Sequence, residues 1–172
     1  LMLLLIGIGF EHAMIEKADR ESKNKSGQLA YLNGFLHSFG ENKAQKLMVK
    51  LDDNEPEAIN TNSFIVANAA PFTTLLAQGG GQPDHRDGLL DVNWLTPNKD
   101  NETTVLSIAE LMFSSITQTH FAINSHYTNA KRVEISADKT LDYVIDGEVK
   151  SADKVVVNIN PASLNVICQE QN

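Results

Sequence analysis

Short apolar runs, many of them alternating with polar residues, recur along most of the chain and constrain its fold more than any other feature. Alternation of this kind is typical of β-strands that bury one face and expose the other. Strands with an alternating or wholly apolar pattern are predicted at residues 1–8, 47–51, 63–67, 90–94, 132–136, 141–145, 155–159 and 163–167. Many short strands favour a mainly β fold, namely a β-sandwich with two or three added helices.

Three segments carry the periodicity of a helix instead. From residue 28 to residue 39, apolar residues recur three and four positions apart, which predicts a helix that ends at Gly40. A second helix is predicted at residues 107–116 and a short one at residues 11–18. The apolar stripe of residues 28–39 is expected either to pack on the sheet or to line a cleft for a lipid.

The 172 residues allow one domain with a substantial core, since 42% of them are hydrophobic. The 22 acidic and 14 basic residues give a net charge of −8, which disfavours nucleic acid as a partner. The net charge offers no attraction to an anionic membrane either, although a local basic patch could still supply one. Because Cys168 is the one cysteine, the sequence excludes an intrachain disulfide and a cysteine-based zinc cage.

The apolar run at residues 1–6 is too short to span a membrane, which takes about 20 apolar residues, and it lacks the basic start of a signal peptide. A buried strand explains it better. Because the chain opens in the middle of this strand, we expect it to be a fragment whose upstream part is missing.

Asp146-Gly147-Glu148 lies between two alternating segments. An Asp-Gly pair in this position favours a two-residue hairpin turn, since both residues tolerate a positive φ. The plainest interpretation is a hairpin without any further role. The functional interpretation uses Glu148, whose carboxylate would be rigid yet accessible at the hairpin tip and could accept a proton from a hydroxyl.

Residues 82–92 combine turn-forming residues and acids ahead of a predicted strand. The plainest interpretation is a polar loop. The functional interpretation is a magnesium site, in which Asp87 offers its carboxylate while a tight turn aims the carbonyl oxygens of Asp84 and Leu89 inward. Magnesium prefers oxygen ligands and keeps several waters, so this donor set would suit it.

Other candidate motifs are weaker. Gly7-Ile8-Gly9 and the three glycines at residues 79–81 could approach a ligand closely, but neither has the spacing of a Walker loop or a dinucleotide fingerprint. The five histidines form no i, i+4 pair, which argues against a zinc site. There is no Gly-x-Ser-x-Gly elbow, so serine hydrolase chemistry has no support.

Taken in order, the motifs of the chain resemble those of one family. They are Gly7-Ile8-Gly9-Phe10, residues 25–32, Asn68, Gly79-Gly80-Gly81, Pro83, Asp87-Gly88-Leu89-Leu90-Asp91-Val92, Asp146-Gly147-Glu148 and Asn160-Pro161-Ala162. This series is similar to the C-terminal domain of the diacylglycerol kinase catalytic-domain family, particularly the bacterial soluble lipid kinases. The resemblance covers nearly the whole chain, and its specific part is the pair of segments 87–92 and 146–148 at their observed separation.

The resemblance implies an ATP- and magnesium-dependent lipid kinase of two domains, related in fold to NAD kinases and sphingosine kinases. Residues 1–172 would form its single C-terminal lipid-kinase domain. The family's nucleotide-binding motif, Gly-Gly-Asp-Gly-Thr, is absent from the sequence, so ATP would be bound mainly by an N-terminal domain outside this chain. The isolated chain is accordingly expected to be inactive.

Residue by residue, the resemblance implies that Glu148 is the general base that takes the proton of the lipid hydroxyl. It likewise implies that Asp84, Asp87 and Leu89 hold a structural magnesium ion. The expected acceptor is diacylglycerol or a related lipid, and the expected location is cytoplasmic and peripheral to the membrane. A homodimer, a sphingoid base as acceptor, and a non-catalytic binding module that keeps the sandwich are open alternatives.

Overall fold

The computed structural model describes residues 2, 4–9, 44–69, 84, 86–97, 125–146 and 148–163. These residues form eight strands, which are β1 (Leu5–Gly9), β2 (Gln45–Leu51), β3 (Glu57–Thr61), β4 (Ser63–Ala67), β5 (Leu90–Leu95), β6 (Ser125–Ala130), β7 (Arg132–Ile145) and β8 (Glu148–Asn158). Every strand pair is antiparallel. No helix among the described residues is long and apolar enough to cross a membrane.

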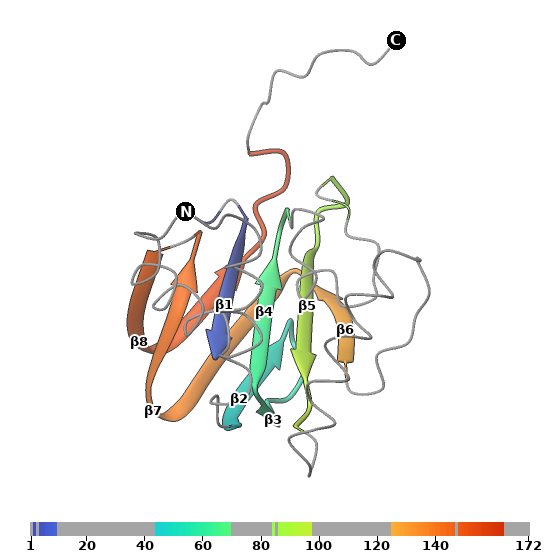
Figure 1. Ribbon diagram of the computed structural model, residues 1–172. Helices are drawn as coiled ribbons and strands as arrows, with labels where there is room; N and C mark the ends of the chain where they lie inside the picture. The colour runs from blue at the N-terminus through green and yellow to red at the C-terminus, as the bar shows by residue number, and fades with distance from the viewer. Residues whose placement is uncertain are drawn as a thin grey trace, which may run out of the picture.

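Strand β7 is the centre of the sheet, because it pairs with three other strands (Figure 1). Strand β8 occupies one of its edges from residue 132 to residue 145. On the opposite edge, residues 133–136 pair with β2 and residues 143–145 pair with β1. Since one edge serves two partners in succession, the sheet divides at this strand into two layers.

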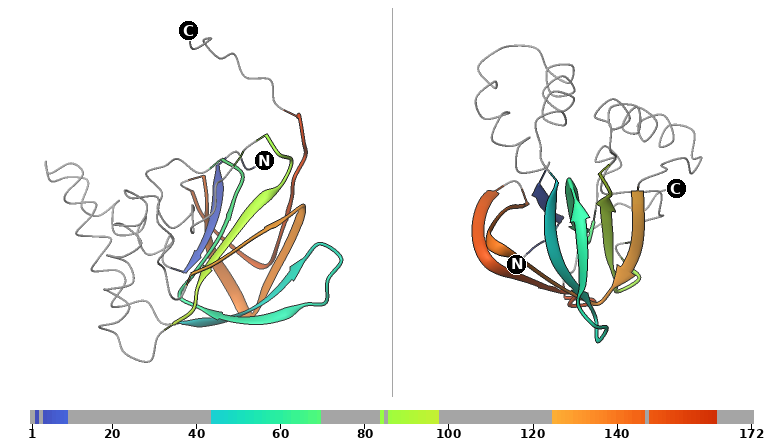
Figure 2. Two further views of the ribbon diagram at one scale, coloured as in Figure 1. Left: turned by 90° about the vertical axis from the view of Figure 1, so that its right-hand side faces the viewer. Right: turned by 90° about the horizontal axis from the view of Figure 1, so that it is seen from below.

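The smaller layer contains β3, β2, the first half of β7 and the part of β8 paired with that half (residues 154–158). The larger layer contains β1, β4, β5, β6, the second half of β7 and the part of β8 paired with it (residues 148–152). A register shift between Ser136 and Leu141 marks the change of layer, and irregularities of this kind bend a strand. The chain also passes between layers at Asn62, between β3 and β4, and at Lys131, between β6 and β7. Figure 2 shows the strongly curled sheet that results. The prediction of a mainly β fold is thereby confirmed.

The core lies between the two layers and is filled by alternate residues of every strand, as the sequence pattern predicts. Its fully buried members include Ile8, Leu47, Phe64, Val92 and Ile135. Strand β4 is different, because all five of its residues are buried. Its two faces are therefore both covered, which explains why the run from Ser63 to Ala67 shows no polar alternation.

Several strand predictions are confirmed and others need correction. Residues 63–67 form a strand as predicted, while residues 132–136 and 141–145 belong to one long strand rather than two. Strand β8 begins at Glu148, seven residues before the predicted start at residue 155. Strands β3 and β6 were not predicted at all. The predicted helices at residues 11–18, 28–39 and 107–116 and all but the first residue of the strand predicted at 163–167 lie outside the described residues.

Gly9 is required by the fold where β1 passes the corner between β3 and β4. Its φ is +88°, and a Cβ atom added there would lie 2.4 Å from the carbonyl oxygen of Asn62. A real Cβ atom cannot approach a backbone oxygen so closely, so the second glycine of Gly7-Ile8-Gly9 has a structural explanation.

Asp52 fixes the other corner, at Lys131. It has a φ of 52°, in the left-handed region, at the turn after β2. Its Oδ1 accepts hydrogen bonds from the backbone N–H groups of Lys131 and Arg132, both at 2.8 Å, and its own N–H donates to the carbonyl of Arg132 at 2.8 Å. One residue thus ties the β2–β3 turn to the place where the chain changes layers.

Replacing Asp52 tests this arrangement. We expect Asp52→Ala to lower the free energy of unfolding by about 2 kcal/mol, because two hydrogen bonds to a carboxylate are lost and alanine tolerates the left-handed region poorly. Asp52→Asn should lower it much less, since asparagine keeps one side-chain oxygen and tolerates this backbone conformation. Urea unfolding of both variants measures the difference. Equal losses in the two variants would contradict the role of the side-chain oxygen.

Candidate functional site

The tip of the β7–β8 hairpin is anchored to the start of β1. Asp146 has a φ of 48°, as a tight Asp-Gly turn requires, and Ile145 pairs with Glu148 across the hairpin. The Oδ1 atom of Asp146 accepts hydrogen bonds from the backbone N–H groups of Leu4 and Leu5 at 2.9 and 3.0 Å. Its N–H donates to the carbonyl of Leu5 at 3.1 Å. The hairpin predicted from the sequence is confirmed, and its tip is held in a fixed place.

Glu148 stands beside this anchor with its side chain 75% exposed. The Nζ atom of Lys150 lies 3.2 Å from its Oε2 atom, which is possible because residues two apart on a strand project from the same face. The carboxylate therefore stands on a hairpin tip that is hydrogen bonded to β1, is accessible to another molecule and lies next to a cation. This geometry suits a group that accepts a proton from an incoming hydroxyl.

The segment from Asp84 to Leu89 makes a tight turn ahead of β5. The N–H of Asp87 donates to the carbonyl of Asp84 at 3.2 Å, and the Oδ1 atom of Asp87 accepts the N–H of Leu89 at 2.8 Å. The carboxylate of Asp84 instead turns to Arg86, accepting its backbone N–H at 3.0 Å and lying 3.4 Å from its Nε atom. Both the carbonyl and the carboxylate of Asp84 thus accept backbone hydrogen bonds within this turn.

The donors of this turn fit a hard cation in chemistry. Asp84, Asp87 and Leu89 offer oxygen atoms, and Asp87 lies exposed. Among the residues that the structure describes, no group of three or more His, Cys, Asp or Glu side chains is arranged to hold a metal. A magnesium ion here would consequently depend on one carboxylate, carbonyl oxygens and water. The ligand set itself stays a prediction.

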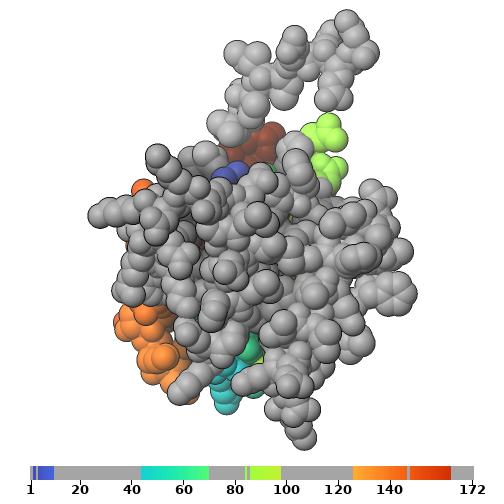
Figure 3. Space-filling view, viewed as in Figure 1, coloured from blue at the N-terminus to red at the C-terminus, as the bar shows by residue number. Residues whose placement is uncertain are grey.

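Gly88 brings a distant segment to this turn. Its φ is +75°, and a Cβ atom added there would lie 3.5 Å from the Cγ atom of Pro161. The segment that follows β8 therefore passes directly over the turn that precedes β5. In Figure 3 the yellow-green and red-brown segments reach the surface side by side at the upper end of the molecule.

Asp91 anchors the start of β5 to β6. Its side chain is only 3% exposed, and its Oδ1 accepts a hydrogen bond from the hydroxyl of Tyr127 at 2.5 Å and another from the amide of Asn129 at 3.0 Å. Burial raises the pKa of Asp91, the two hydrogen bonds oppose that rise, and the charges of Asp87 and Asp84 add to it. Burial, followed by the hydrogen bond to Asp91, raises the pKa of Tyr127 to about 12.

Both predicted sites lie at the same end of the larger layer. The register aligns Leu5 with Ala67, and Ala67 with Asp91, so the start of β1, the end of β4 and the start of β5 are level. Asn68 follows β4 and donates its N–H to the carbonyl of Leu4 at 2.8 Å. Since Asp146 also binds Leu4 and Leu5, the structure gathers the hairpin tip, Asn68 and the turn before β5 at this end.

Two members of this end were missed by sequence reasoning. Tyr127 and Asn129 alternate along a run that is too polar to suggest a strand, so neither they nor β6 were predicted. The signal that could have found them is Asp91, because a carboxylate inside an apolar strand has to be hydrogen bonded.

The sequence matches the profile of a family described as YegS C-terminal NAD kinase beta sandwich-like domain, over residues 5–168. It is also similar to an uncharacterized protein of Synechocystis sp., with 31% identity over 173 residues. That match covers 99% of this chain and 39% of the Synechocystis protein, so the chain spans well under half the length of this curated relative.

Solved structures with a similar fold include two putative diacylglycerol kinases from Bacillus anthracis. The first has a TM-score of 0.59 and 16% identity, over 95% of this chain and 55% of that one. The second has a TM-score of 0.57 and 15% identity, over 91% of this chain and 50% of that one. The chain therefore matches about half the length of each, and the likeness supports the β-sandwich fold.

The raised pKa of Tyr127 yields a measurable prediction. A tyrosine whose pKa is about 12 in the folded state and about 10 when unfolded favours folding below pH 10, and this contribution is lost as the pH rises toward 12. Absorbance at 295 nm, recorded for the native protein minus Tyr127→Phe, should show one phenol titrating near pH 12. A difference titration centred near pH 10 would contradict the partly buried hydrogen bond to Asp91.

Proposed function

Because the chain belongs to the family of YegS C-terminal NAD kinase beta sandwich-like domains, we propose that it is the lipid-binding part of an ATP- and magnesium-dependent kinase. This kinase transfers the γ-phosphate of ATP to a hydroxyl of diacylglycerol or a related lipid. The observation that supports it best is the gathering of the Asp146-Gly147-Glu148 tip, Asn68 and the Asp84–Leu89 turn at one end of the larger layer.

In the proposed reaction, Glu148 accepts the proton of the lipid hydroxyl as that oxygen forms a bond to the γ-phosphorus. The bond between the γ-phosphorus and the bridging oxygen breaks at the same time, and ADP leaves with its electron pair. The hydroxyl proton remains on the carboxyl group of Glu148. Phosphoryl transfer has a largely dissociative transition state, so the fixed position of the tip contributes more than the basicity of the carboxylate.

The turn before β5 supports the site without entering the reaction. Asp87 through its carboxylate, and Asp84 and Leu89 through their carbonyl oxygens, would hold magnesium there. The bound ion would neutralise the acidic charge of the turn and order it next to Pro161. ATP itself would be bound mainly outside this chain, whose sequence has no Gly-Gly-Asp-Gly-Thr motif.

Glu148→Gln in the full-length enzyme tests the catalytic proposal. We expect the turnover number to fall about a hundredfold, which is the smallest rate loss usual when a general base is removed. The KM for the lipid should stay nearly unchanged. Glu57→Gln, at an exposed position of β3, is the matched control, because it makes the same chemical change on a different strand. Native turnover in Glu148→Gln would remove the general-base role.

Asp87→Asn tests the metal proposal separately. Magnesium should raise the melting temperature of the native protein above its value in EDTA, since a ligand that binds only the folded state stabilises it. Asp87→Asn should abolish most of that rise, and Asp53→Asn, in the turn after β2, should keep it. If magnesium raised the melting temperature of Asp87→Asn as much as that of the native protein, the metal site would lie elsewhere.

The acceptor and the need for a second domain can be decided together. The 172-residue chain alone should phosphorylate no lipid, and the full-length protein should use diacylglycerol with labelled ATP. Activity of the isolated chain would contradict the proposal that ATP is bound mainly outside this chain. Preference for a sphingoid base would change the acceptor, and inactivity of the full-length protein on every lipid would favour a non-catalytic binding module.

A further inference from the structure

The outer face of the smaller layer has the opposite charge to the chain as a whole. We define the basic face by the outward residues Lys46, Met48, Lys50, Arg132, Lys154 and Val156 on β2, β7 and β8. The core residues Leu47, Val49, Val133, Val155 and Val157 alternate with them and point inward. Along the paired stretches of β2, β7 and β8, this face carries four cations and one acid, Glu134, although the chain has a net charge of −8.

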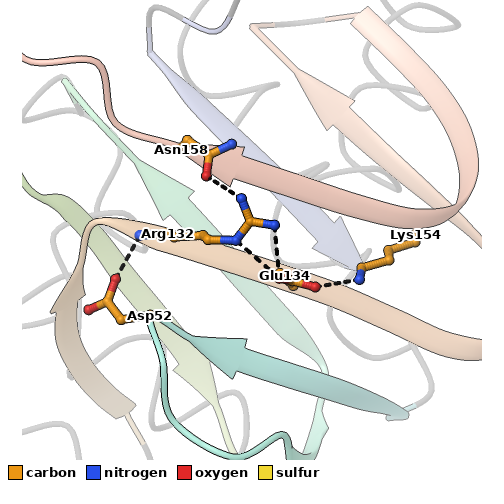
Figure 4. A network of polar contacts seen from close by, with 5 residues as sticks. All are labelled: Asp52, Arg132, Glu134, Lys154 and Asn158. Carbon is orange, nitrogen blue, oxygen red and sulfur yellow. Dashed lines mark hydrogen bonds and ion pairs between the residues drawn. The ribbon is translucent and has the colours of Figure 1, made fainter.

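Glu134 holds two of these cations in place (Figure 4). Its Oε1 atom accepts hydrogen bonds from Nε and Nη2 of Arg132 at 3.0 and 2.9 Å, and its Oε2 atom pairs with Nζ of Lys154. Arg132 also donates from Nη1 to the side-chain oxygen of Asn158 at 2.8 Å. Hydrogen bonds from Lys154 and Arg132 lower the pKa of Glu134 to about 2, so the network persists at neutral pH.

Two apolar side chains lie exposed between the cations. Met48 is 37% exposed and Val156 is 42% exposed. The register places Met48 level with Ser136 and Lys154, and Lys50 level with Glu134 and Val156. The basic face thus combines long cationic side chains with partly exposed apolar ones, an arrangement typical of a surface that lies in a membrane interface.

Acids flank this face at its ends. Asp52 and Asp53 lie in the turn after β2, and Asp138 lies in the bend of β7. The carboxylate of Asp52 is directed to the backbone at the β6–β7 corner. Since the Debye length is about 8 Å at physiological ionic strength, acids on the rest of the chain are screened from a surface that contacts the basic face.

We infer that the basic face docks on an anionic lipid surface. The four cations supply the electrostatic attraction, and Met48 and Val156 supply apolar contact with the boundary between headgroups and acyl chains. The choice of a membrane over another polyanion rests on the proposed function, because an acceptor with two acyl tails resides in a bilayer.

Vesicle sedimentation of the full-length protein tests this inference. The protein should bind vesicles of equimolar phosphatidylglycerol and phosphatidylcholine, more weakly as salt rises, and should not bind vesicles of phosphatidylcholine alone. Lys46→Glu combined with Lys50→Glu should weaken binding about tenfold or more. The matched control combines Lys131→Glu with Lys139→Glu, which makes the same change in net charge outside the basic face and should weaken binding far less.

Equal loss in the two double variants, or unchanged binding by Lys46→Glu with Lys50→Glu, would overturn the inference. Self-association that this double variant abolishes, without vesicle binding by the native protein, would assign the basic face to a second copy of the chain. Phosphorylation of diacylglycerol in detergent micelles separates this inference from the proposed function. Micellar activity without vesicle binding defeats the docking face alone, and vesicle binding without micellar activity defeats the kinase alone.

Discussion

The geometry of the molecule depends on the pairing of a single strand. Strand β7 gives one edge to β8 and divides the other between β2 and β1, so two directions of sheet start from the same strand. The register shift after Ser136 bends β7 between these two partners, so that β2 and β1 continue different layers. The buried core, the curled shape and the separation of the two faces all follow from this arrangement.

The same strand sets the positions of the candidate catalytic site and of the proposed docking face. Its second half leads to Asp146 and Glu148, where the hydrogen bonds from Leu4 and Leu5 fix the hairpin tip against β1. Its first half carries Arg132 and Glu134 on the outer face of the smaller layer. Asp52 and Asp146 repeat one device, a left-handed aspartate whose Oδ1 accepts two consecutive backbone N–H groups, close to the two ends of β7. The candidate catalytic tip and the proposed docking face thus lie on different halves of the same strand.

Local chemistry was readable from the sequence, and long-range pairing was not. The Asp146-Gly147 turn was predictable because its backbone preference is intrinsic to those two residues, and the run from 63 to 67 was predictable from its apolar character. Strand β3 escaped prediction because an edge strand with one buried face and polar neighbours has no clear pattern, and β6 escaped for the same reason. The bond between Asp91 and Tyr127 joins residues 36 positions apart, which no periodicity could indicate. That Glu148 and Asp87 occupy the same end of the sheet required the register of β1, β4 and β5.

The position of β1 has a consequence for the order of assembly. This strand lies between β4 and β7, and its partner Ile145 is separated from Ile6 by nearly the whole described chain. During synthesis β1 can pair with β4 early, but its other edge stays open until the last hairpin emerges from the ribosome. An apolar edge that waits this long is a natural place for errors of pairing with other chains. The anchor at Asp146 therefore forms only after both β1 and the β7–β8 hairpin have been synthesised.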